Sequence, residues 1–223
     1  MKGVADPTFA ACFEDVLDVY ARAFDPKRPL VCFDETGKEL QAHTRPPLPP
    51  APGLPAREDY EYERHGSSNL FLAVAPLLGW RKATPTTQRT RIEWAQAIKA
   101  LVDEDFPGAE KIVLVQDNLN THTPASLYAA FSPAEAKRIW DKLEFHYTPK
   151  HGSWLNMAEL EISVLRRQCL DRRIPDAATL EREVQAWAGQ RNAARATISW
   201  SLTKEIAREK LPWIYPNAQQ DNS

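Results

Sequence analysis

The sequence has 223 residues, of which 43% are apolar, and seven of them are tryptophans, so one folded domain with a buried core is expected and a disordered chain is excluded. A formal charge of −2, from 28 basic and 30 acidic residues, gives the chain no overall attraction to nucleic acid. Three widely spaced cysteines predict neither a disulfide framework nor a zinc cluster and suit a reducing cytosol, and no segment has the apolar length of a signal core or a membrane span.

The first half of the chain predicts one helix and three strands. Apolar residues at helical spacing indicate an amphipathic helix over residues 9–20. The apolar run 30–33, closed by a turn signal at Thr36-Gly37, predicts a short buried strand. Six prolines within residues 45–56 exclude a helix or a central strand and predict an extended loop that joins two strands. That loop is either a solvated connection or an arm that grips a second subunit or DNA.

Two further strands are expected over residues 69–78 and 80–84, across a turn at Gly79. The remaining predicted elements are a helix over 89–103, a strand over 111–116, helices over 124–131 and 133–142, a strand over 143–147, and helices over 153–170 and 177–195. Three meander-like strands followed by strands that alternate with helices predict an α/β fold, with a mixed sheet and helices on its faces.

Two of the predicted strands end in a carboxylate. Asp34 follows the first strand, and Asp117 follows the strand over 111–116. Ligands gather at the carboxyl ends of strands in such sheets, so the two aspartates could converge in one crevice, where a hard cation such as Mg²⁺ would relieve their repulsion. Each aspartate alone is explained as well by a turn or a helix cap.

A third carboxylate comes from the helix predicted to begin at Ser153. Glu159 and Glu161 lie on opposite flanks of its apolar stripe, each about 80° from the centre of the stripe. Periodicity does not choose between them. Either one could also be a solvated helix edge whose charge suits the positive end of the helix dipole.

Three segments in order resemble the signature blocks of DDE transposases of the mariner-related bacterial insertion-sequence group. They are Val31-Cys-Phe-Asp-Glu-Thr36, Val115-Gln-Asp-Asn-Leu-Asn-Thr-His122 and Trp154-Leu-Asn-Met-Ala-Glu159. The likeness continues at the C-terminal end, at Trp187, Arg191-Asn192 and Trp200. It implies a ribonuclease H-like catalytic domain over residues 29–216, preceded by a helix and linker over 1–28 and followed by a tail over 217–223.

The resemblance also implies the catalytic residues. Asp34 matches the first acid, Asp117 the second, and Glu159 the third, because the family reads Leu-Asn-Pro-x-Glu and Glu161 lies off that pattern. These acids would hold two Mg²⁺ or Mn²⁺ ions, with Asp34 bridging them. One ion would activate water or a 3′-hydroxyl and the other would stabilise the leaving oxygen, so that the enzyme cleaves a transposon end and joins it to target DNA, at a TA dinucleotide in relatives.

Other candidate residues surround these acids. Side chains that could support them are Glu35, Asn118, His122 and Asn156. His122 could donate to a phosphate or orient Asp117, or it could simply be exposed on its loop. The basic residues near the third block are Lys150, His151, Arg166, Arg167, Arg172 and Arg173. They form either a phosphate track or a solvated basic face.

The chain departs from the family pattern in three places. Met157 stands where many relatives have proline, the gap between Asp117 and Glu159 is wider, and only 33 residues precede Asp34, where complete relatives carry helix-turn-helix segments. We therefore expect the downstream half of a split reading frame, a truncated copy or an excised catalytic domain. The implied partners are DNA, at transposon ends and target, and a second copy in a homodimer on DNA, in the bacterial cytoplasm at the nucleoid.

Two other functions compete with this interpretation. A silent transposase remnant would bind DNA or dimerise without cutting, but drift has no reason to spare all three acids. A nuclease or ribonuclease H-type enzyme on the same fold would share the acids, but it would lack the Leu-Asn-x-x-Glu block and the C-terminal match.

Overall fold

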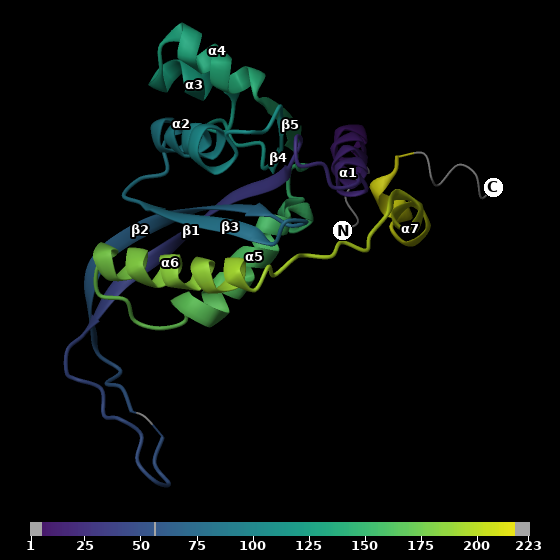
Figure 1. The fold of residues 1–223 in the computed structure, drawn as a ribbon. Helices are drawn as coiled ribbons and strands as arrows, with labels where there is room; N and C mark the ends of the chain where they lie inside the picture. The colour runs from purple at the N-terminus through teal and green to yellow at the C-terminus, as the bar shows by residue number, and fades with distance from the viewer. Residues whose placement is uncertain (1–5, 56, 217–223) are drawn as a thin grey trace.

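The computed structural model describes residues 6–55 and 57–216, which build one mixed β-sheet with helices on both faces (Figure 1). The strand order is β3-β2-β1-β4-β5. The first three strands form an antiparallel meander, and β4 and β5 run parallel to β1. The predicted α/β fold is therefore confirmed, and the predicted tail over residues 217–223 lies outside the described residues.

The first two strands are longer than the sequence predicted. β1 (Leu30–His43) and β2 (Tyr62–Ala75) each have 14 residues and project from the body as a hairpin arm, at the end of which the proline-rich loop lies (Figure 1). The predicted end of the first strand at Thr36-Gly37 is wrong, because Gly37 stays extended and pairs with Asn69. The described part of the loop is extended as predicted, with an isolated bridge between Leu48 and Arg57.

The other strands and the helices lie close to their predicted positions. They are β3 (Trp80–Thr86), β4 (Ile112–Gln116), β5 (Leu143–Tyr147), α1 (Pro7–Tyr20), α2 (Arg91–Ala100), α3 (Pro124–Ala130), α4 (Pro133–Asp141), α5 (Met157–Leu165) and α6 (Ala177–Ala193). One short helix, α7 (Lys204–Lys210), was not predicted. Helices α2 and α5 both continue into a π-helical turn, over Leu101–Asp105 and Arg166–Leu170.

The helix that carries the third carboxylate begins later than predicted. Ser153–Leu155 forms a separate 3₁₀ turn, and α5 starts at Met157. Asn156 has extended backbone and is the N-cap, because its side chain accepts a hydrogen bond from the Ala158 N–H. The shift places Glu159 in the first helical turn.

The sheet buries apolar side chains on both faces. One face packs against α2, α3 and α4 through a cluster that includes Phe33, Phe71 and Trp94. On the other face, α1, the start of α5 and the segment after α6 pack around Phe13 and Cys32, and α5 and α6 pack around Leu72. Helix α1 is therefore part of the core next to α5. None of the helices in the described ranges combines the length and apolarity needed to cross a membrane.

Candidate active site

The carboxylates of the three sequence motifs come from elements that meet at one place on the sheet. Asp34 lies on β1, Asp117 directly follows β4, and Glu159 is in the first turn of α5. Cys32 pairs with Val115 in the parallel register of β1 and β4. Because Asp34 and Asp117 each lie two residues further along, they stand level on neighbouring strands.

Asp34 is the buried member of this group, with 8% of its surface exposed. Burial raises its pKa to about 7, against a hydrogen bond from the Glu35 N–H that lowers it, and the charges of Asp117, Glu159 and Glu35 raise it further. The carboxylates thus lie within electrostatic range of one another. Over the described ranges, no three His, Cys, Asp or Glu side chains already stand in an arrangement that would hold a metal ion.

Asn156 connects the buried carboxylate to α5. Its side chain is fully buried, and Nδ2 donates to the Phe33 carbonyl at 2.9 Å and to Oδ2 of Asp34 at 3.2 Å. Its Oδ1 accepts from the Ala158 N–H at 3.1 Å. One side chain therefore both orients Asp34 and caps the helix that carries Glu159.

His122 is buried between two carboxylates and is not exposed on its loop. Its Nδ1 lies 2.5 Å from Oδ1 of Asp117, and its Nε2 lies 3.1 Å from Oε2 of Glu35. Burial lowers its pKa, but the hydrogen bonds to Asp117 and Glu35 outweigh burial and raise the pKa to about 9. At neutral pH an imidazolium therefore lies between the two carboxylates, with Nδ1 donating to Asp117 and Nε2 forming an ion pair with Glu35. The ring stacks on Trp94 and meets the edge of Phe33, which fixes its plane.

Glu161, which periodicity did not separate from Glu159, points into the protein. It is 1% exposed. Its carboxylate lies 2.8 Å from Nε of the fully buried Arg81 and accepts from Nε and Nη2 of Arg191 at 2.6 and 3.0 Å. Two arginines compensate its charge, whereas Glu159 is half-buried beside the aspartates.

Residues 29–181 match the family described as DDE superfamily endonuclease. The match spans more than half of the chain and includes all three motif carboxylates. The chain belongs to this family. No curated protein matches the chain significantly.

Solved structures that resemble this DDE endonuclease domain include several of the Mos1 mariner transposase. The Mos1 catalytic domain superposes with a TM-score of 0.55 at 10% identity, covering 94% of this chain and 91% of that one. The Mos1 strand transfer complex gives 0.58 at 11% identity, covering 95% of this chain and 61% of that one. The paired end complex with Mn gives 0.57 at 13% identity, and the chain spans 62% of that longer protein. At these identities the likeness shows a shared ribonuclease H-like fold.

Tyr20 also supports the candidate site, and no sequence pattern pointed to it. The last residue of α1, it donates its hydroxyl hydrogen to the Leu155 carbonyl at 2.7 Å and accepts from the Met157 N–H at 3.3 Å. These two contacts hold the backbone on both sides of Asn156. Burial raises the pKa of Tyr20 well above its usual value, so the hydroxyl stays protonated.

The predicted basic residues lie in three places. Lys150 and His151 are exposed in the loop before α5, whereas Arg166 and Arg167 lie beyond its C-terminal end. Arg166 donates to the hydroxyl of Thr36 at 2.6 Å, which places it beside β1 two residues past Asp34.

The third place is the base of the hairpin arm. Arg172 forms an ion pair with Glu183, and Arg173 donates to the Glu61 carbonyl at 3.0 Å. Both guanidinium groups are thus engaged within the chain. Asn118 is exposed in the loop after β4.

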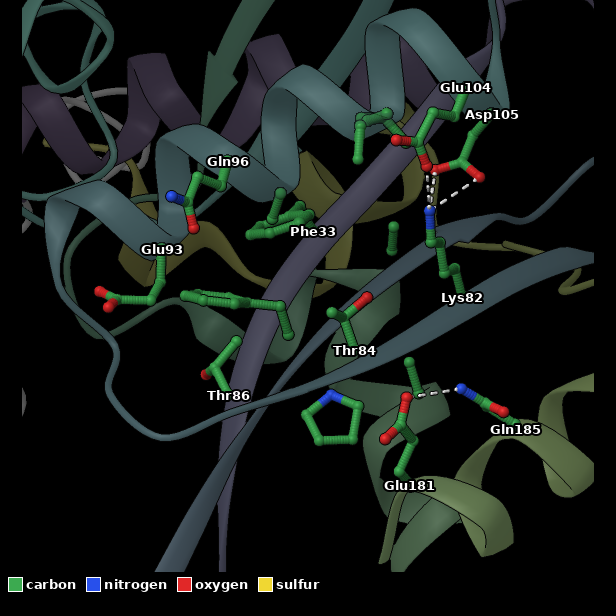
Figure 2. Close-up of a pocket in the computed structure, with 17 residues that line it drawn as sticks. Phe33, Lys82, Thr84, Thr86, Glu93, Gln96, Glu104, Asp105, Glu181 and Gln185 are labelled. Carbon is green, nitrogen blue, oxygen red and sulfur yellow. Dashed lines mark hydrogen bonds and ion pairs between the residues drawn. The ribbon is translucent and has the colours of Figure 1, made fainter. Parts of the chain in front are cut away.

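A cavity of about 500 Å³ lies elsewhere, between α2, β3 and the start of α6 (Figure 2). Phe33 and Phe71 belong to its apolar lining, and Lys82 pairs with Asp105 at 2.9 Å on its wall. None of the three motif carboxylates lines it. It is therefore separate from the candidate active site.

Proposed function

We propose that this chain is the catalytic domain of a DNA transposase of the mariner-related bacterial insertion-sequence group, which cleaves DNA strands at element ends and transfers them to target DNA. The observation that carries the proposal is the buried carboxylate of Asp34, which lies within electrostatic range of Asp117 and Glu159 on a ribonuclease H-like sheet. Such a concentration of negative charge destabilises a fold by itself, and it is typical of a site whose ligand carries the opposite charge.

The residues fit a divalent cation. Carboxylate oxygens are the ligands that Mg²⁺ and Mn²⁺ prefer, and a cation would offset both the burial of Asp34, which is the main cause of its raised pKa, and the repulsion from the neighbouring acids. Asp34, Asp117 and Glu159 would hold two ions, and solved Mos1 paired end complexes are described with Mn and with Mg. Bound ions would activate water or a 3′-hydroxyl and stabilise the leaving oxygen.

The neighbouring side chains hold these carboxylates in place. Asn156 donates to Oδ2 of Asp34, and the Glu35 N–H donates to the other oxygen at 2.8 Å. His122 contacts Asp117 through Nδ1 and forms an ion pair with Glu35 through Nε2, which fixes the position of Asp117. The aspartates are thereby oriented before any substrate binds, which lowers the cost of assembling the site.

The implied partners are DNA and a second copy of the chain. The Mos1 complexes that share the fold are described with paired transposon ends and with transferred strands. Lys150, His151, Arg166 and Arg167 would contact backbone phosphates, and the hairpin arm would reach a second subunit. We place this activity at the bacterial nucleoid.

Calorimetry with Mn²⁺ tests the carboxylate site directly, on the parent chain, on Asp117→Ala and on Asp141→Ala. Asp141 is an exposed aspartate on α4 and is the matched control. We expect the parent and Asp141→Ala to bind Mn²⁺ and Asp117→Ala to lose binding. If none binds, a repeat with cleaved DNA present separates a site that phosphates complete from acids that do not converge.

A nicking assay separates the proposal from its alternative. Asp34→Asn and Asp117→Asn should abolish metal-dependent cleavage while the fold is retained. A parent chain that binds metal and DNA but never cleaves, even when supplied with the upstream DNA-binding segment of a complete relative, would instead be a catalytically silent remnant.

A further inference from the structure

The turn that precedes α5 presents an aromatic ring to solvent. Trp154 is 46% exposed, and its ring centroid lies 6.0 Å from that of the buried Phe13 on α1. Phe13 supports one part of the indole and leaves the rest open. Trp154 stands two residues before Asn156, whose amide donates to Asp34, so the turn that carries the open ring leads directly into the acidic site.

This ring sits on a backbone that is already fixed. The Leu155 N–H donates to the Gly152 carbonyl at 3.0 Å, and the Tyr20 hydroxyl donates to the Leu155 carbonyl at 2.7 Å. A side chain on Gly152 would place Cβ 2.6 Å from Cγ of Pro149, so the turn packs tightly there. A ligand that stacks on Trp154 therefore pays little ordering entropy in this backbone.

Two exposed basic side chains precede the ring in the same turn. Lys150 and His151 are both exposed, and across residues 6–55 and 57–216 neither has a hydrogen-bond or ion-pair partner. Arg172, in contrast, already pairs with Glu183. The backbone of His151 is left-handed, with φ 64°, which turns the chain sharply between Lys150 and the ring.

We propose that Trp154 is a stacking surface for one unpaired nucleotide of the DNA strand held at the acidic site, with the phosphate of that nucleotide beside Lys150 and His151. The inference rests on the proposed function and adds that one nucleotide of the DNA strand is unpaired beside the acidic site. In a duplex both faces of a base are covered by its neighbours, so an indole face stacks on a base that has left the helix. Stacking of this kind is tolerant of sequence, because every base has a π-face.

Trp140 provides a matched comparison within the same chain. It is 40% exposed, close to Trp154, but it lies on α4. Its ring already meets the edge of Tyr128 at 6.3 Å and carries the Lys137 ammonium at 5.3 Å. Exposure alone is therefore similar at the two tryptophans, and the surroundings differ.

The test is anisotropy of a short fluorescein-labelled oligothymidylate, titrated with the whole chain in a chelator so that no cleavage occurs. Trp154→Leu keeps an apolar cover over Phe13 but removes the π-face, and we expect it to weaken binding about tenfold. Trp154→Phe should restore most of the affinity, and Trp140→Leu should stay within about twofold of the parent. Thermal unfolding of each variant confirms that it is folded.

Three outcomes overturn the proposal: a parent chain that does not bind the oligothymidylate, Trp154→Leu and Trp140→Leu that weaken it equally, or a blunt duplex that loses as much affinity to Trp154→Leu as the single strand does. The measurement needs neither metal nor cleavage, so its failure leaves the proposed function standing. Conversely, a chain that stacks the oligothymidylate on Trp154 but never cleaves DNA would retain this site and lose the proposed function.

Discussion

Two groups of charge are held out of water along α5, and the protein compensates them differently. At Glu161, at the start of the second turn of α5, Arg81 and Arg191 both contact the carboxylate, and the fully buried Arg81 lies between strand and helix. At Asp34, burial and like charges raise the pKa to about 7, and the contacts to its carboxylate oxygens come from an amide side chain and a backbone N–H.

Under the proposed function, this difference separates a structural charge from a functional one. The Glu161 group joins β3, α5 and α6 through ion pairs between one carboxylate and two arginines, which the fold needs once those charges are buried. The Asp34 group keeps its negative charge at a cost in stability, and its imidazolium, His122, contacts Asp117 and Glu35. A cation-binding site would keep negative charge that the protein does not neutralise itself, because full internal compensation would leave no charge for the cation to neutralise.

The largest effect on stability is expected at Glu161. Glu161→Gln removes the charge that compensates Arg81 and leaves that arginine buried without its carboxylate. We expect the free energy of unfolding to fall by about 3–5 kcal/mol. Urea unfolding followed by far-UV circular dichroism measures it.

Glu159→Gln on the same helix is the control. Glu159 is half-buried beside other acids, so its neutral variant should unfold within about 0.5 kcal/mol of the parent while metal-dependent nicking is lost. A Glu161→Gln chain that unfolds like the parent yet cleaves as poorly as Glu159→Gln would reverse the assignment of the two glutamates.

The second prediction concerns the uncompensated group and its pH dependence. The pKa of Asp34 is raised from 3.8 to about 7 in the folded chain, so its ionisation opposes folding at pH above 7 and has no effect at pH below 3.8. In a chelator, stability should therefore fall as pH rises from about 4 to 7. Asp34→Asn should remove that slope and be more stable than the parent above pH 7, by up to about 4 kcal/mol.

Mn²⁺ sharpens this prediction. A cation that binds the parent and not Asp34→Asn stabilises only the parent, so saturating Mn²⁺ should reduce or reverse the stability difference above pH 7. Unfolding of both chains at several pH values, with and without Mn²⁺, measures it. If Asp34→Asn has the same dependence of stability on pH as the parent, ionisation of Asp34 does not destabilise the fold.

The fold followed from sequence wherever burial imposed a pattern. The four aliphatic residues of β4 predict a strand that is covered on both faces. The apolar stripe of α1 predicts a helix that packs on one side. The hairpin arm escaped prediction because most of it leaves the core, and beyond Gly37 only Leu40 of β1 is buried, which is too little to impose an alternating pattern. Glycine at position 37 indicates a turn in the sequence, but its pairing with Asn69 keeps the backbone extended.

The site was predictable where it depends on the ends of hydrophobic runs and not where it depends on distant contacts. Asp34 and Asp117 each follow such a run, although β1 itself continues past Asp34 to His43. The difference between Glu159 and Glu161 is invisible to periodicity, because it is made by arginines on β3 and α6. The burial of His122 likewise comes from packing against Trp94, which no local pattern encodes.

The last prediction concerns Tyr20, where a small loss of stability should accompany a larger loss of activity. Its hydroxyl reaches the Leu155 carbonyl across 135 residues of sequence, and it also accepts from the Met157 N–H. Tyr20→Phe removes both contacts and keeps the ring, so we expect a loss of about 1–2 kcal/mol in the free energy of unfolding. We expect cleavage to fall by at least about tenfold in kcat with KM for DNA unchanged, because the turn that positions Asn156 and Glu159 loosens.

Trp200→Phe is the matched control, because Trp200 packs edge-on against the Tyr20 ring at 5.1 Å and its indole N–H donates to the Leu202 carbonyl at 2.9 Å, away from the turn backbone. It should lower stability by a similar amount and leave kcat close to the parent value. If both variants reduce kcat in proportion to their stability, the hydroxyl of Tyr20 acts through the fold as a whole. If Tyr20→Phe alone reduces kcat, α1 belongs to the catalytic machinery, and the uncompensated acids depend on a helix that lies before the first of them in sequence.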